Sequence, residues 1–234
     1  MPATVPAAFA AALAAGDPAR PLLTWYDDAT GDRAELSGAT LANWVAKTAN
    51  LLVDGCGRGA GDTAAVDAPP HWQTGAVLLG CWSAGLRVAA DRPDVVFAAA
   101  DRAAAHAGTG ADVYGMALAP LAAPMRQPPP GVADYVTEVR LHGDHFHPAV
   151  PVRADDPATE LTHAELCAAA AERAGALNIG AGDRVLIVAQ AHPDPLDWLL
   201  APLVAGASVV LCAHPDPAAL PGRATTERAT LTLR

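Results

Sequence analysis

The sequence predicts an α/β fold with two pseudo-symmetric α/β sub-domains, whose largely parallel sheets are flanked by helices. The first observation behind this prediction is an internal repeat. When the chain is shifted by 121 residues, residues 59–94 align with residues 180–215, and 11 of the 36 aligned pairs are identical. A self-match at a fixed spacing indicates one supersecondary unit used twice. The second observation is that helical and buried-strand patterns alternate along the chain, which is typical of parallel sheets with right-handed crossovers.

The first half contains a hairpin followed by alternating helices and strands. Two β-rich runs at 22–26 and 34–36 are separated by a polar stretch with Gly31, which predicts the hairpin. Ser37 is expected to cap a helix whose apolar residues recur at helical spacing as far as Leu52. The pattern then predicts strands at 63–67, 86–90, 95–99, 113–118 and 135–141, and helices at 71–84 and 102–107.

The second half begins after a linker at 148–156. Thr162 and Glu165 form a capping box at the start of a helix. The pattern then predicts strands at 184–189, 208–211 and 230–233, and helices at 163–177, 196–205 and 218–227. We therefore expect a first α/β subdomain over residues 1–150 and a second, truncated α/β subdomain over residues 151–234.

Composition and charge exclude several classes of protein. With a net charge of −10 and no basic stripe, the chain is not expected to bind nucleic acid. Its longest uncharged stretch, 198–215, contains Pro202 and Gly206 and is too short to span a bilayer comfortably, so we expect no membrane association. The four cysteines form no Cys-x-x-Cys pair, and no signal peptide is recognisable. These features predict a cytoplasmic protein with reduced thiols.

Two histidines occupy equivalent places in the repeat. His71 and His192 each follow the first strand of their copy and precede the next helix. In a parallel sheet this place is the carboxyl edge, where ligands bind. Two interpretations remain open: each imidazole faces a cleft as a binding or acid–base group, or each only caps the following helix.

A second group of histidines lies at His142, His145 and His147. On a strand His145 and His147 would share one face while Asp144 would point to the other. Zinc needs three or four converging ligands, and no second cluster supplies them, although His163 or His214 could approach in space, so we predict no metal. We also predict no other cofactor. A metal site at these three histidines is the less favoured alternative. The three serines lie in no Gly-x-Ser-x-Gly elbow, so no catalytic residue is assigned.

Several stretches resemble the AMP-binding, adenylate-forming enzyme superfamily, and in particular the N-terminal region of acyl-CoA synthetases. The resemblance covers most of the chain except 91–155, and it rests on the segments LLTWYDDATGDRAELSGATLANWVAKTANLL, GAGD, LLGCWSAG, ELTHAELCAAAAERAGAL, DWLLAPLVAGASVVLC and ATTERATLTL, which follow one another in the family's order. It implies two pseudo-symmetric α/β subdomains, in agreement with the repeat. It also implies an acyl or adenylate pocket near His192, Pro193 and Trp198.

The chain departs from that family at the phosphate-binding loop. The loop's Ser/Thr/Gly-rich segment should precede Leu161, and this place holds Asp155, Asp156, Pro157, Ala158, Thr159 and Glu160. The segment has no glycine to bring amides against phosphate and no lysine. A carboxylate about 4 Å from a phosphate charge costs about 4 kcal/mol at an effective dielectric constant near 20. The chain also ends before the family's later nucleotide-binding motifs and its small C-terminal domain.

These departures lead us to expect a pseudoenzyme: a truncated, non-catalytic relative that serves as a binding or regulatory scaffold without ATP-dependent acid activation. Its expected partners are an acyl or adenylate-like small molecule and, because an edge strand of the second sheet is left open, a second copy of the chain or a partner protein. The alternative is an enzyme with repurposed chemistry in the cleft, which uses His71 and His192 or a metal bound by the 142–147 histidines.

Overall fold

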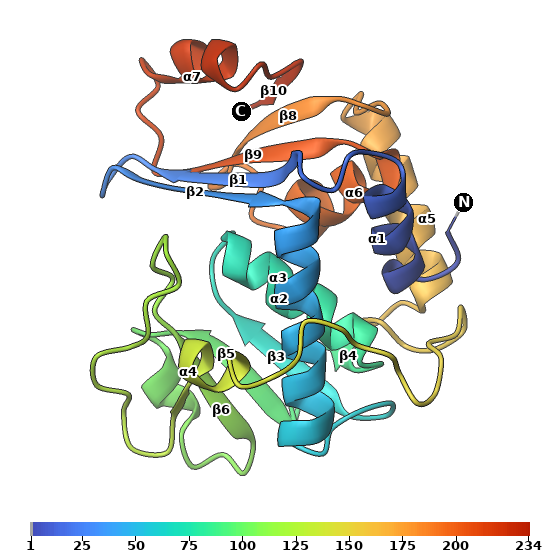
Figure 1. Cartoon of the computed structure of the whole chain (residues 1–234), viewed down its shortest axis with the longest axis vertical. Coiled ribbons are helices and arrows are strands. Elements are labelled where there is room, and N and C mark those ends of the chain that lie inside the picture. Colours follow the sequence, from blue (N-terminus) through green and yellow to red (C-terminus); the bar gives the residue numbers. More distant parts are fainter. Residues whose placement is uncertain (1) are drawn as a thin grey trace. The chain divides into compact units, whose positions relative to one another are not determined.

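The computed structural model describes residues 2–234 as a mixed α/β fold with two mostly parallel five-stranded sheets and flanking helices. Figure 1 shows β1, β2, β8 and β9 in one sheet and β3, β5 and β6 in the other. The chain divides into two compact units. Unit 1 consists of the residues up to Leu41, Pro70–Gly75 and Ala164–Arg234; unit 2 consists of Ala42–Pro69 and Ala76–His163. The fold class is therefore the predicted one.

The sheet of unit 1 has the strand order β10-β8-β9-β1-β2. The predicted hairpin is present, since β1 (Pro21–Asp27) pairs antiparallel with β2 (Asp32–Ser37). All other pairs are parallel: β9 (Ser208–Ala213) pairs with β1 and with β8 (Arg184–Val188), and β8 pairs with β10 (Leu231–Leu233).

Helices cover the sheet of unit 1. On one face, a buried cluster joins Leu186 and Val210 of the sheet to Leu220 of α7 (Leu220–Thr226). The π-helix η3 (Leu196–Leu200) and the helix α6 (Ala201–Ala205) contact β9, and α6 packs against α1. The remaining helices of this unit are α1 (Val5–Ala14) and α5 (His163–Ala176), whose first residue belongs to unit 2.

The sheet of unit 2 is parallel throughout, with the order β4-β3-β5-β6-β7. Its strands are β3 (Thr63–Asp67), β4 (Arg87–Val88), β5 (Val95–Ala99), β6 (Asp112–Met116) and β7 (Ala133–Asp134). On one face, small side chains form a buried cluster with the 3-10 helix η2 (Ala103–His106): Ala65, Val96, Ala98, Ala103, Val113 and Val132.

Two longer helices contribute residues to both units. These are α2 (Gly38–Asn50), which continues into the π-helix η1 (Leu51–Gly55), and α3 (Trp72–Ser83). Each unit is therefore built from separate stretches of the sequence. The division into contiguous domains at 1–150 and 151–234 stays a prediction.

Among the described residues, no helix combines the length and the apolar character that crossing a bilayer requires.

The turns and first strands of the two aligned sequence segments share local geometry, whereas their helices differ, with α3 in the first and η3 followed by α6 in the second, so the repeat stays a prediction. Gly59 N–H donates to the Asp62 carboxylate at 2.8 Å, and Gly180 N–H donates to Asp183 at 2.7 Å. The strands that follow pair in the same register: 63 opposite 87 in β3 and β4, and 184 opposite 208 in β8 and β9. Gly85 and Gly206 both adopt left-handed backbone (φ 84° and 76°), which glycine tolerates without strain.

One predicted strand is wrong. Residues 135–141 form the helix α4 (Tyr135–Val139) instead. Asp134 caps this helix, because its carboxylate accepts the Thr137 N–H at 2.6 Å. The buried residues Tyr135, Val136 and Val139 also satisfy helical spacing, so an apolar run that suits a strand forms one helical face.

Candidate functional site

His71 caps a helix in the structure. It precedes α3, and its Nδ1 accepts the N–H of Gln73 at 3.1 Å. The side chain is only 1% exposed and meets the Trp25 ring edge-on, with 4.4 Å between the ring centroids. This geometry supports the capping interpretation of His71, which is packed into the interior of unit 1.

His192 belongs to a different arrangement at the carboxyl end of β8. Its Nδ1 lies 2.8 Å from the Asp197 carboxylate, and both side chains are nearly buried at 12% and 11% exposure. Arg173 binds the same carboxylate with two N–H groups, at 2.6 and 2.8 Å. The hydrogen bond from Arg173, more than the one with His192, holds the pKa of Asp197 below its usual value.

This cluster of His192, Asp197 and Arg173 can orient an imidazole. A carboxylate on Nδ1 selects the tautomer with the proton on that nitrogen, which leaves Nε2 as the acceptor. The bidentate contact with Arg173 keeps the carboxylate ionised and in position. The cluster is therefore suited to binding a hydrogen-bond donor or to acid–base work at the carboxyl edge of the sheet.

The other two candidates near His192 have different surroundings. Pro193 is exposed in the loop before η3. Trp198 is 1% exposed, and a Cβ on Gly75 would lie 3.4 Å from its ring, so the indole is part of the interior of unit 1. Sequence reasoning missed Asp197 and Arg173. The position of Asp197 in the first turn of η3, five residues after His192, was an available signal, whereas nothing in the sequence indicates the contact with Arg173.

The segment 155–160, which the sequence resemblance places at the phosphate loop, is closed on itself. The amides of Ala158 and Thr159 both donate to the Leu161 carbonyl, at 2.9 and 3.0 Å, and Pro157 forms an isolated β-bridge with Thr162. Ala158 is fully buried. These amides are therefore already bonded, whereas a phosphate loop presents its amides to the ligand.

Two further contacts attach this segment to the body of unit 2. The Ala158 carbonyl accepts the Trp82 indole N–H at 2.9 Å and the Val88 amide at 2.8 Å. The acids of the segment bind arginines, since Asp155 pairs with Arg153 at 3.2 Å and Glu160 with Arg87 at 3.0 Å. Asp156 instead accepts the Arg153 backbone N–H at 2.7 Å.

The histidines at His142, His145 and His147 lie in a loop of unit 2. Lys47 of α2 binds the His142 carbonyl at 2.5 Å and the Asp144 carboxylate at 2.8 Å. Within residues 2–234, no group of three or more His, Cys, Asp or Glu side chains is arranged to hold a metal ion. The loop is thus attached to α2 through its backbone carbonyls.

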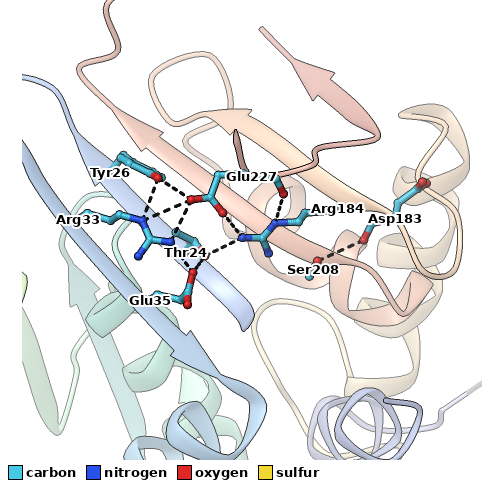
Figure 2. A network of polar contacts seen from close by, with 8 residues as sticks. All are labelled: Thr24, Tyr26, Arg33, Glu35, Asp183, Arg184, Ser208 and Glu227. Atoms are coloured by element: carbon cyan, nitrogen blue, oxygen red, sulfur yellow. Dashed lines mark hydrogen bonds and ion pairs between the residues drawn. The ribbon is translucent and has the colours of Figure 1, made fainter. Parts of the chain in front are cut away.

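Sequence reasoning also missed a network of charges around a nearly buried carboxylate in unit 1 (Figure 2). The Glu227 side chain is 7% exposed and lies between Arg33 of β2, at 3.0 Å, and Arg184 of β8, at 2.5 Å. The Tyr26 hydroxyl donates to the same carboxylate at 2.5 Å. Burial raises the pKa of Glu227, but the hydrogen bonds from Tyr26, Arg184 and Arg33 outweigh it and lower the pKa to about 2.

The network has a structural role: it links the sheet to the end of α7, and its charges are paired with one another and so are not available to a ligand. Glu35 and Glu227 balance the charges of Arg33 and Arg184. Arg184 also donates to Thr24 at 3.0 Å, so its guanidinium is well satisfied. A cavity of about 620 Å³ borders the network, but it lies at the amino ends of β8 and β9, whereas ligands of parallel sheets bind at the carboxyl ends.

No family model matches the chain. A protein of Mycobacterium tuberculosis described as a TIGR03089 family protein is 43% identical over 245 residues, which is 99% of each chain. The chain belongs to the TIGR03089 family. The description of that relative states no activity, so membership of this family does not by itself assign a reaction.

Solved structures show the fold that this TIGR03089 family member shares. The acyl-CoA synthetase of Brucella canis matches with a TM-score of 0.76 at 17% identity, over 98% of this chain and 46% of the synthetase. The acetoacetyl-CoA synthetase of Streptomyces lividans matches with a TM-score of 0.76 at 17% identity, over 98% of this chain and 42% of its own. A fatty acyl CoA synthetase of Mycobacterium tuberculosis matches with a TM-score of 0.69 at 16% identity, over 98% and 49%. The chain therefore spans about half the length of these synthetases.

Proposed function

We propose that this protein is a non-catalytic binding or regulatory scaffold of the adenylate-forming fold, and that it does not activate acids with ATP. One observation supports this most directly: the amides of Ala158 and Thr159 are bonded to the Leu161 carbonyl, in the segment that the sequence resemblance places at the phosphate loop. Releasing them for a triphosphate would break these bonds and expose the buried Ala158. The acids Asp155 and Glu160 add unfavourable charge beside any bound phosphate.

The proposed ligand is an acyl or adenylate-like small molecule in the region of His192. The near-burial of His192 and its contact with Asp197 support a role in recognition, because an imidazole held in one tautomer is a directional hydrogen-bonding group. The location at the carboxyl end of β8 supports the same role.

Two measurements test the proposal. We expect no ATP–pyrophosphate exchange with short-chain, long-chain or 3-keto acids, and no thermal shift with ATP and magnesium. A fatty acyl-adenylate or a free acid is expected to raise the melting temperature, and the gain should be smaller in His192→Ala. A ligand at 100 times its Kd adds about 2.7 kcal/mol to the free energy of unfolding, so tight ATP binding would be detected and would overturn the proposal.

The Asp197–His192 pair favours a second candidate, an enzyme with repurposed chemistry in this region. Such an enzyme predicts a turnover that His192→Ala abolishes. His214→Ala is the matched control, because His214 also contacts a carboxylate, Asp27 at 3.0 Å, but its side chain is 63% exposed. Elemental analysis of the purified protein tests the version that depends on a metal.

We also propose that the protein is cytoplasmic and forms a homodimer or binds a partner protein. Support for association comes from β10, which is an edge strand of the unit 1 sheet in the described part of the chain. Exposed backbone groups of an edge strand can pair with another chain. Light scattering after size-exclusion chromatography tests self-association, and a monomer at all concentrations would contradict the dimer.

A further inference from the structure

Unit 2 contains a pocket of about 810 Å³ at the carboxyl ends of β3 and β4. This volume is within the usual range of about 300–1,000 Å³ for small-molecule sites. Small side chains leave the space open, and most of the wall is apolar: Ala65, Val66, Val88, Ala89, Pro93 and Val96. The sheet changes direction here, since β4 lies on one side of β3 and β5 on the other, and ligands of open α/β sheets bind at such positions.

A fixed polar cluster forms one side of the pocket. Asp67, the last residue of β3, lies 3.0 Å from Nε2 of His106 and accepts an N–H of Arg102 at 2.9 Å. Hydrogen bonds from His106 and Arg102 lower the pKa of Asp67. The carboxylate is thus ionised and already bonded, and it holds the His106 ring in place.

Arg92 supplies a cation to the pocket. Its side chain lines the pocket and is exposed, and no hydrogen bond or ion pair involves it in the described part of the chain. The neighbouring acids are engaged elsewhere: Asp91 binds Arg87 at 3.0 Å, and Asp94 accepts the Thr63 amide at 2.9 Å. Arg92 also adopts φ 43° directly before a proline, a left-handed conformation that favours glycine.

We propose that this pocket binds a small organic anion whose single negative charge is attached to a compact apolar body. The Arg92 guanidinium binds the anionic group, because arginine forms paired N–H bonds to planar oxyanions. The alanine, valine and proline wall takes the apolar body. Asp67 limits the charge of the ligand, since a second negative charge would lie close to an ionised carboxylate. This site lies within unit 2 and is separate from the His192 cluster of unit 1.

Three probes separate the parts of this proposal. Benzoate has both the charge and the apolar body, benzamide keeps the body without the charge, and inorganic phosphate has charge without the body. In an NMR titration at constant ionic strength, we expect saturable shifts with benzoate at the amides of Asp67, Ala89 and Thr109. Benzamide and phosphate should bind at least about tenfold more weakly, which corresponds to about 1.4 kcal/mol. Equal binding of benzamide, or no saturable binding of benzoate, would overturn the proposal.

Substitutions of Arg92 test whether its guanidinium binds the anionic group of the ligand. Arg92→Gln is expected to raise the Kd for benzoate about tenfold. Arg126→Gln is the matched control, because Arg126 is another exposed arginine of unit 2, does not line the pocket, and has no hydrogen bond or ion pair with the residues that the structure describes. Arg92→Gly removes the guanidinium while relaxing the left-handed backbone, so it should fold at least as well as the wild type and still lose binding. Undiminished affinity in Arg92→Gly would contradict the assignment. These outcomes are independent of the ATP measurements, which address a different segment.

Discussion

Trp82 of α3 donates its indole N–H to the carbonyl of Ala158, 2.9 Å away. Both residues are buried, at 2% and 0% exposure. This hydrogen bond attaches the segment 155–160 to the helix α3 of unit 2. The segment 155–160 is thus bonded to the interior of unit 2.

The first prediction concerns that bond. Trp82→Phe removes the indole N–H and leaves a buried carbonyl with one donor fewer, so we expect a loss of about 1–3 kcal/mol in the free energy of unfolding in addition to the cavity effect. The amides of Ala158, Thr159 and His163 should exchange hydrogen faster. Urea unfolding and native-state hydrogen exchange measure the two effects.

Trp198→Phe is the matched control for this prediction. Trp198 is equally buried, at 1%, but its indole nitrogen has no hydrogen-bond partner within residues 2–234. Both variants lose the same atoms, so a larger loss in Trp82→Phe measures the hydrogen bond. Unchanged exchange at Ala158 in Trp82→Phe would show that the segment is held by other contacts.

The second prediction concerns Glu227 and acid. Its pKa in the folded protein is about 2, against an ordinary value of 4.5. A carboxyl whose pKa is lowered by folding stabilises the protein above its unfolded-state pKa, and this contribution is lost as the pH falls from about 4.5 to about 2. Glu227→Gln should therefore destabilise the protein by about 3 kcal/mol at pH near 7, because it leaves Arg184 and Arg33 without their buried partner.

As the pH falls from about 4.5 to about 2, the difference between Glu227→Gln and the wild type should narrow, because the unfolded chain takes up the proton first and the folded wild type loses the same charge only near pH 2. Urea unfolding midpoints at the two pH values test this. Glu160→Gln is the control, because Glu160 is 81% exposed and pairs with Arg87 at the surface, so its effect should stay within about 1 kcal/mol. A pH-independent difference would contradict the low pKa.

The third prediction concerns Gly80 in α3. A Cβ at this position would lie 2.6 Å from Thr48 Cβ and 3.3 Å from the Val45 carbonyl, so α2 and α3 approach too closely for any side chain. Gly80→Ala should cost about 1–3 kcal/mol. Gly175→Ala in α5 meets nothing within 4 Å and should instead stabilise the protein by about 0.5–1 kcal/mol, because alanine favours the helix. Thermal unfolding of the two variants measures the opposite signs.

The fold was more predictable from the sequence than the site. The hairpin and the parallel strands follow from short-range patterns of apolar residues and turns, and the structure contains them. The helix at Tyr135–Val139 was not predicted. Its apolar residues fit a strand as well as a helix, and the hydrogen bond from the Thr137 N–H to Asp134 favours the helix. The histidines at 142–147 left a metal site open as the less favoured alternative, and the structure bonds the backbone carbonyls of His142 and His145 to α2.

Contacts between distant elements account for what the sequence could not indicate. Arg173 in α5 binds Asp197 in η3, and Glu227 meets Arg33 across 194 residues. Such pairs leave no local pattern, because each residue alone is an ordinary surface charge on its own helix or strand. The pocket beside Asp67 also depends on small side chains from separate strands, whose joint effect appears only when the sheet is assembled.

The last prediction concerns the His192 imidazole. Asp197 lies 2.8 Å from Nδ1, so we expect the neutral ring to carry its proton on Nδ1. In Asp197→Asn the carboxylate that selects this tautomer is lost, and Arg173 loses its charged partner. The ring should then populate both tautomers. The free energy of unfolding should fall by less than for a fully buried pair, because the Arg173 side chain is 39% exposed and solvent screens its charge. Nitrogen-15 chemical shifts of the His192 ring report the tautomer, and Arg173→Gln separates the causes: it removes the ion pair but keeps the carboxylate on Nδ1. If the tautomer changed equally in both variants, the ordering of the ring would depend on Arg173 more than on the direct contact with Asp197, and His192 would lose its main support as a directional binding group.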